Sequence, residues 1–254
     1  MTMRSLIFTL LIVGTLASYE ELWREWKRKY NKERNGLEDA VRRKIWIDNV
    51  EYIQERNLHH DLGLITYELG LNQFTDMTFD EFKAKYLSDI RSTSNLVKGG
   101  IPYDSTNSTV PESIDWREAQ CVTDVKNQED ECKYDENLGR VKVTEFYTVY
   151  TGKEDTLKKL IGEQGPASVT LEVDRDFMLY KKGIYQCKCS SKVRMNQMLL
   201  AVGYGTENGN DFWIVKNSWG TSWGERGYIR LVRNTENKCG IASMATLPKL
   251  AHFS

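Results

Sequence analysis

The side chains with the clearest chemical potential lie in one Gly- and Trp-rich run. Asn217 is followed there by Trp219 and Gly220, and a second Trp-Gly pair stands at 223–224. A side-chain amide that is held under an indole and shielded from water is a good orienting group, because its carbonyl can fix the tautomer of a neighbouring imidazole. The run therefore predicts the amide member of a hydrolytic triad, and a loop that merely packs is the competing interpretation.

The run resembles the Asn segment of papain-family cysteine proteases, in which a Cys, a His and an Asn form the triad. Residues 122–128 resemble the segment that leads to the nucleophile of that family. Gln128 stands where the family has the glutamine whose amide donates to the oxyanion. The resemblance implies hydrolysis of peptide bonds in protein or peptide substrates, with no cofactor and no metal. Asn217 would then be a retained orienting residue.

The nucleophile of such a triad is absent. After Gln128 the chain continues with three acidic residues at 129–131 instead of the Gly-x-Cys-Gly-Ser-Cys-Trp of the family, and it contains no Cys-Trp pair. Cys132 is a poor replacement because the three preceding carboxylates disfavour a thiolate. We expect an internal deletion that removes the nucleophile and most of the helical left subdomain.

The base is missing as well. The family carries a His before the strand that ends in Val-Gly-Tyr-Gly, which is 202–205 here, and Gln197 occupies the His position. A glutamine cannot accept and return a proton near neutral pH. The chain has three His residues, and His252 is the only one after residue 60. We expect a cysteine protease by descent that lacks activity, unless a Lys or a carboxylate serves as the base.

The first residues are typical of a secretory signal peptide, predicted at 1–17. Arg4 precedes an apolar run from Leu6 to Leu16, which is too short to span a bilayer. We expect no membrane contact after its removal, and a location outside the cell, in lysosomes or in secretory vesicles. Asn107 begins a glycosylation sequon. Five cysteines leave at least one unpaired; they stand at 121, 132, 187, 189 and 239.

Residues 18–90 are predicted to be mainly helical. Aromatic residues at 19, 23, 26 and 30 form one helical stripe, and Asn35-Gly36 should end that helix. A second helix is expected over 37–58, a short strand over 65–69 and a third helix over 78–86, capped by Thr78 with Glu81. The apolar face expected for the second helix is Leu37, Val41, Ile45 and Ile53.

Two spaced motifs in this segment resemble those of cathepsin L-type propeptides. The first has Trp46 in the place of a Phe and consists of Glu38, Arg42, Trp46, Asn49, Ile53 and Asn57. Taken alone, its polar members could lie on a solvated face. The second consists of Gly70, Asn72, Phe74 and Asp76.

The resemblance implies a helical inhibitory propeptide that threads the cleft of its own enzyme until acid releases it. Asp76 would link that release to low pH, because protonation removes its charge-assisted bonds. His59 and His60 are interpreted as surface residues beyond the helix end, without a metal or catalytic role.

Residues 91–109 are expected to be a linker with the processing site, and residues 110–254 a peptidase domain. Strands are expected at 146–150, 167–173, 199–204, 212–215 and 228–232, with helices at 154–161 and 176–180. The predicted fold class is α+β. It is a helical propeptide followed by a truncated papain-like fold that keeps mainly the antiparallel, barrel-like right domain. By resemblance, Cys239 pairs with Cys187 or Cys189.

The net charge of −1 argues against a nucleic-acid partner, which needs a basic face. Two alternatives to an inactive zymogen remain. The intact propeptide could inhibit a complete cathepsin L-like protease. The sequence could also be a faulty gene model or an alternative transcript of an active protease, which transcript reads across Gln128 and Glu129 would reveal.

Overall fold

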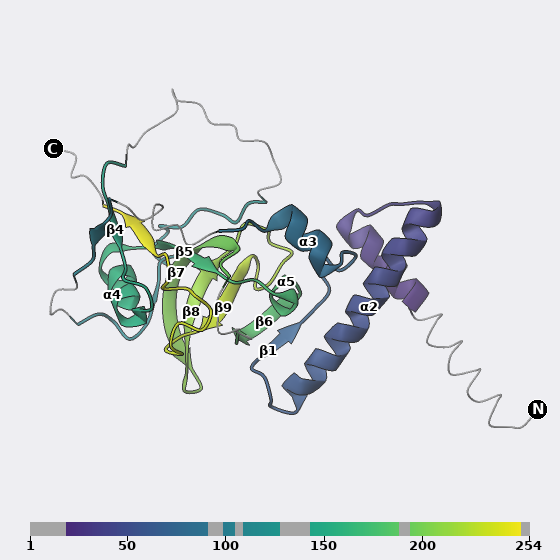
Figure 1. Ribbon diagram of the computed structural model, residues 1–254. Helices are drawn as coiled ribbons and strands as arrows, with labels where there is room; N and C mark the ends of the chain where they lie inside the picture. Colours follow the sequence, from purple (N-terminus) through teal and green to yellow (C-terminus); the bar gives the residue numbers. More distant parts are fainter. Residues whose placement is uncertain (1–18, 91–98, 105–108, 128–142, 188–193, 250–254) are drawn as a thin grey trace, which may run out of the picture.

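The computed structural model describes residues 19–90, 99–104, 109–127, 143–187 and 194–249 (Figure 1). Helices from the amino-terminal part lie beside one edge of a ten-stranded sheet, so the α+β class is confirmed. Within these residues no helix has the length and apolar character needed to cross a membrane. Several positions singled out from the sequence lie outside the described residues: the segment 1–17, Asn107, Gln128, Cys132, Cys189 and His252.

The first helix covers residues 19–30 and ends five residues earlier than expected. Asn31 takes a left-handed conformation with φ of 52°, which stops the helix before Asn35-Gly36 is reached. Asn35 instead precedes α2, which runs over Gly36–Asp61. The aromatic stripe packs as predicted, because Trp23 and Trp26 form a separate small core with Trp46 of α2.

The buried face of α2 differs from the expected one. Leu37 and Val41 are 82% and 49% exposed, whereas Ile53 is buried. The other residues buried on this helix are Trp46, Asn49 and Val50. Near its start, α2 contacts the first helix through Asp39, which pairs with Lys27 and accepts a hydrogen bond from Trp23, and Leu37 and Val41 lie outside this contact. His59 and His60 also lie inside α2, in its last turn, and not beyond its end.

Strand β1, Tyr67–Leu69, joins this amino-terminal part to the sheet by antiparallel pairing with β6, Tyr180–Tyr185. The two backbones approach closely at Gly183, which has a φ of +95° and faces Thr66. A Cβ at Gly183 would stand 2.5 Å from the Thr66 carbonyl oxygen, so only glycine fits there. After β1, helix α3 runs over Phe79–Tyr86.

The capping box predicted for α3 is present. The Thr78 hydroxyl accepts a hydrogen bond from the Glu81 backbone N–H at 3.2 Å, and the Glu81 carboxylate accepts one from the Thr78 backbone N–H at 2.9 Å. Two of the donors that a helix start leaves without partners are therefore satisfied.

The sheet has the order β1-β6-β9-β8-β7-β5-β10-β4-β2, with β3 pairing β7. Most neighbours are antiparallel, but β6 pairs β9 and β2 pairs β4 in parallel, so the sheet is mixed and not purely antiparallel as predicted. The remaining strands are β2 Ile101–Pro102, β3 Ile114–Asp115, β4 Phe146–Thr148, β5 Ala167–Leu171, β7 Gln197–Glu207, β8 Asn210–Lys216, β9 Tyr228–Val232 and β10 Thr246–Pro248.

Two helices accompany these strands. Helix α4, Glu154–Gln164, is longer than expected and buries Leu157, Leu160 and Ile161. Helix α5 covers only Arg175–Met178, because Tyr180 already belongs to β6. One continuous core joins both parts of the chain: Phe74 and Phe82 of the amino-terminal part belong to the same cluster as the residues of the sheet.

The carboxyl-terminal loop is held by a disulfide and by a buried carboxylate. Cys187 is bonded to Cys239, with the two Cα atoms 5.5 Å apart. The Glu154 carboxylate accepts hydrogen bonds from the backbone N–H groups of Asn234, at 2.9 Å, and Asn237, at 2.8 Å. These hydrogen bonds satisfy backbone N–H donors of the turn, which burial would otherwise leave without a partner. Cys121 is a free, exposed cysteine.

Candidate functional site

Asn217 and Gln197 come together as the triad pattern predicts. Asn217 follows β8 and Gln197 begins β7, and both side chains are buried. The Gln197 Nε2 donates to the Asn217 Oδ1 across a long distance of 3.5 Å, and the Ser218 backbone N–H donates to the same oxygen at 2.8 Å. The Asn217 Nδ2 is buried without a hydrogen-bond partner among the described residues. The geometry is that of an orienting amide facing a second amide.

Trp219 is buried in a cluster of aromatic rings next to this pair. Its indole is 4% exposed and meets the rings of Phe177 and Trp223 edge-on, at centroid distances of 5.8 and 5.1 Å. Phe74 and Phe82 of the amino-terminal part approach the same indole at 5.6 and 5.1 Å. Trp219 therefore packs against rings from both parts of the chain, two residues after Asn217.

The segment that leads to Gln128 lies beside this loop. The Lys216 Nζ donates to the Thr123 carbonyl at 2.6 Å, and the Gly220 N–H donates to the Lys126 carbonyl at 3.3 Å. Asn127 forms a β-bridge with Trp219 and is the last residue described before Gln128. The last described residue before Gln128 thus lies close in space to the loop that carries Asn217.

A cavity of about 280 Å³ lies beside this loop and is lined by residues from both parts of the chain. It is lined by Lys85, Tyr86, Ser88, Ile90, Asn127, Asn196, Gln197, Met198, Ser218 and Trp219. The Ser88 N–H donates to the Asn196 carbonyl at 2.9 Å, and the Ile90 N–H donates to the Met195 carbonyl at 3.2 Å. Residues 85–90 therefore run along the wall that carries Gln197.

The lining offers amides, hydroxyls and one ammonium group, but no thiol, imidazole or carboxylate among its residues. The free Cys121 is not one of them. Lys216 lies nearby, and burial lowers the pKa of its ammonium group. Its Nζ is nevertheless engaged with the Thr123 carbonyl, so it is not positioned to remove a proton from a group in the cavity.

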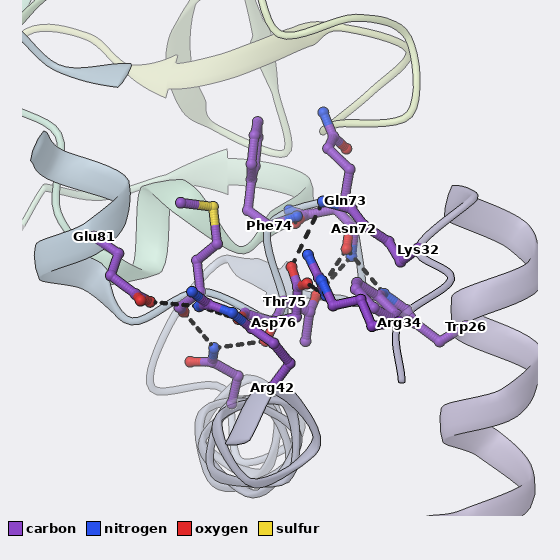
Figure 2. Close-up of polar contacts among 12 residues, drawn as sticks. Trp26, Lys32, Arg34, Arg42, Asn72, Gln73, Phe74, Thr75, Asp76 and Glu81 are labelled. Carbon is purple, nitrogen blue, oxygen red and sulfur yellow. Dashed lines mark hydrogen bonds and ion pairs between the residues drawn. The ribbon is translucent and has the colours of Figure 1, made fainter. Parts of the chain in front are cut away.

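The two propeptide-like motifs meet around Asp76, as Figure 2 shows. The fully buried Asp76 carboxylate pairs with Arg34, and its backbone carbonyl accepts a hydrogen bond from the Arg42 Nη1 at 3.1 Å. The same Arg42 atom donates to Glu81 at 2.8 Å. Asn49 is buried here, with its amide donating to the Thr75 carbonyl at 2.8 Å, so the solvated-face interpretation is wrong for this position.

The other motif residues make contacts within the amino-terminal part or with the elements next to it. Asn57 exchanges hydrogen bonds with the Leu69 backbone, at 2.8 and 3.0 Å. Asn72 donates to the Met178 carbonyl at 2.8 Å and so reaches α5. Gly70 packs against the Lys181 side chain, Trp46 and Ile53 are buried, and Glu38 pairs with Arg34 on the surface.

Acid should weaken the Arg42–Glu81 pair. The Arg42 guanidinium lowers the pKa of the Glu81 carboxyl, so the pair stabilises the fold above about pH 4.5 and is lost as pH falls through the folded-state pKa. We expect Glu81→Gln to reduce the free energy of unfolding by about 0.5 kcal/mol at pH 6, because the pair is partly exposed. Urea unfolding at pH 6 and pH 3 checks this: an equal deficit at both values would contradict it.

Two contacts of the amino-terminal part were missed from the sequence. The Gln73 Nε2 donates to the Trp219 carbonyl at 2.6 Å, although Gln73 lies between motif positions and carries no periodic signal. Asp176 of α5 is fully buried and accepts hydrogen bonds from Tyr52, Arg56 and Tyr67. The only sequence signal for Asp176 is a charged run, 174–176, directly before an apolar stretch.

Comparisons with known proteins agree with this architecture. The profile of papain family cysteine proteases matches residues 128–249, and that of the cathepsin propeptide inhibitor domain (I29) matches residues 23–82. A cathepsin L-like proteinase of Fasciola hepatica is 44% identical, over 99% of this chain and all of that protein. Cathepsin S of Rattus norvegicus is 29% identical, over 93% of this chain and 94% of its own.

Solved structures show the same relationship. Digestive procathepsin L2 from the larval midgut of Tenebrio molitor aligns with a TM-score of 0.83 and 27% identity, over 91% of this chain and all of that one. A recombinant stem bromelain precursor aligns with a TM-score of 0.80 and 26% identity, over 92% of this chain and 99% of that one. The Fasciola alignment spans 325 positions against 254 residues here, so at least 71 of its positions lack a counterpart in this chain.

Proposed function

The chain belongs to the papain family of cysteine proteases, as a cathepsin L-like member with a propeptide inhibitor domain, and we propose that it is proteolytically inactive. The observation that carries the proposal is the amide pair. Gln197 stands 3.5 Å from Asn217, at the place where the triad needs an imidazole. A side-chain amide does not act as a general base near neutral pH, so this pair cannot activate a thiol.

The missing nucleophile supports the same proposal. Among the described residues that line the cavity, none carries a thiol. In the sequence, the acidic run at 129–131 stands where the resemblance places the Cys block. Gln128 and Asn217 are retained positions of an oxyanion donor and an orienting amide, and neither performs hydrolysis alone. The proposal divides the chain into a signal peptide (1–17), a propeptide (18–90), a linker (91–109) and a shortened peptidase domain (110–254). It places the protein on the secretory route.

We expect purified, acid-treated protein to show no turnover of a peptide substrate and no labelling by an epoxide probe directed at active-site thiols. The matched variant is Gln197→His, which restores the imidazole beside Asn217 but supplies no sulfur, and it should remain inactive. Turnover that the epoxide abolishes would contradict the proposal, and activity gained by the Gln197→His variant would show that a nucleophile exists.

A second candidate function is inhibition of a complete cathepsin L-like protease by residues 18–90. The specific support is the Asp76 network, in which residues of both propeptide-like motifs contact one another (Figure 2). In the full chain these residues bind the chain's own sheet, for example through Gln73 and Trp219. Titration of residues 18–90 against an active cathepsin L decides: absence of inhibition at micromolar concentration excludes this function.

A further inference from the structure

The guanidinium of Arg56 is the centre of the contact between α2 and α5. Its Nε donates to the Asp176 carboxylate at 3.0 Å, and its Nη2 donates to the Tyr67 hydroxyl at 2.9 Å. The Tyr67 hydroxyl donates in turn to Asp176 at 2.6 Å, and Tyr52 donates to the other carboxylate oxygen. Burial and the Asp176 carboxylate both raise the pKa of Tyr52 and Tyr67, so their hydroxyls stay protonated as donors.

The third partner of this guanidinium is a histidine. The Arg56 Nη1 lies 3.0 Å from the His59 Nδ1, three residues further along the same face of α2. A guanidinium has only donors, so the His59 Nδ1 must accept and the ring must be neutral, with its proton on Nε2. A protonated ring would present a donor and a positive charge to Arg56 instead.

We propose that His59 is a proton-sensitive positioning residue for the Arg56–Asp176 contact. Protonation removes the acceptor from the Arg56 Nη1 and places two cations side by side, so the ring turns away and the hold of α2 on α5 weakens. The imidazole is the side chain whose charge ordinarily changes between pH 5 and pH 8. This inference does not depend on whether the chain cleaves peptides.

The other charged and titratable groups around this contact do not replace His59. From α5, Arg175 stacks on the Tyr52 ring, 3.9 Å from its centroid, and also donates to Asn49. His60 lies 3.4 Å from Asp61 and makes no contact with Arg56 among the contacts described. A protonated His60 gains from Asp61, whereas a protonated His59 loses its bond to Arg56. The two neighbouring histidines therefore respond to acid in opposite ways.

The test measures hydrogen exchange of the α2 backbone over residues 52–61 in the full chain, at pH 7 and pH 5, after correction for the intrinsic exchange rate. We expect acid to increase opening of this segment roughly two- to fourfold more in the wild type than in His59→Gln, which keeps an acceptor that cannot be protonated. The matched control His60→Gln keeps His59 but loses the favourable charge beside Asp61, so its opening should increase with acid at least as much as in the wild type. A fixed charge in His59→Lys should produce the acid level of opening at pH 7.

Equal acid responses of the wild type and His59→Gln would overturn the proposal, and so would loss of the response in His60→Gln. If His59→Lys exchanged at pH 7 as slowly as His59→Gln, a charge beside Arg56 would have no effect and the proposal would fail. Every variant keeps the same carboxylates, so their contribution to the acid response cancels in these comparisons.

Discussion

Replacement of Asp176 with Asn should lower the free energy of unfolding by about 3 kcal/mol at pH 7, because it leaves the largely buried Arg56 without its counter-charge. An amide also cannot accept hydrogen bonds on both of its atoms, so one of the Tyr52 and Tyr67 hydroxyls loses its acceptor. Urea unfolding of the full chain, followed by tryptophan fluorescence, measures the loss.

The control for this prediction is an exposed ion pair on α2, the helix that carries Arg56. Asp48 and Lys44 are four residues apart, exposed and 3.1 Å from each other. Asp48→Asn should change the free energy of unfolding by no more than about 0.5 kcal/mol, since exposed pairs of this kind contribute little. Similar effects of Asp48→Asn and Asp176→Asn would show that the contact between α2 and α5 does not stabilise the fold.

Truncation of Trp219 to Ala should cost about 4 kcal/mol, the usual size for an aromatic side chain removed from a packed core. The indole meets four rings, two from each part of the chain, so its loss opens a cavity at the junction. A chain of this length should melt roughly 10 °C lower as a result. Circular dichroism melting of the full chain checks this value.

Two variants place limits on the Trp219 effect. Trp219→Phe keeps an aromatic ring in the cluster and should recover about half of the lost stability. Tyr150→Ala removes a side chain that is 65% exposed and should leave melting unchanged. If Trp219→Ala melted as the wild type does, the amino-terminal part and the sheet would not share a core, contrary to the cluster that contains Phe74 and Phe82.

The features that could be predicted from sequence are those set by local spacing or by a motif. The capping box of Thr78 and Glu81 depends on residues three apart, and it forms as expected. The approach of Gln197 to Asn217 followed from the order of strands implied by the resemblance, and the two amides do meet. In these cases the residues that determine the contact belong to the sequence motif itself.

Other features depend on surfaces that no local pattern describes. The apolar periodicity of α2 could not reveal that Leu37 is exposed while Asn49 donates hydrogen bonds to two backbone carbonyls. The burial of Asp176 depends on side chains more than a hundred residues earlier in the sequence. The left-handed residue that ends the first helix is Asn31, one of several Asn residues that could have taken that conformation.

The pairing of β1 with β6 sets the order in which the molecule can be completed during synthesis. Tyr67 leaves the ribosome more than a hundred residues before Gly183, its partner across the strands. The edge of the sheet is therefore a long-range pairing that closes late, after the helical amino-terminal part has had time to assemble its own tryptophan core. The helices of the amino-terminal part, which are synthesised first, can then present β1 as an edge with which β6 pairs once it has left the ribosome.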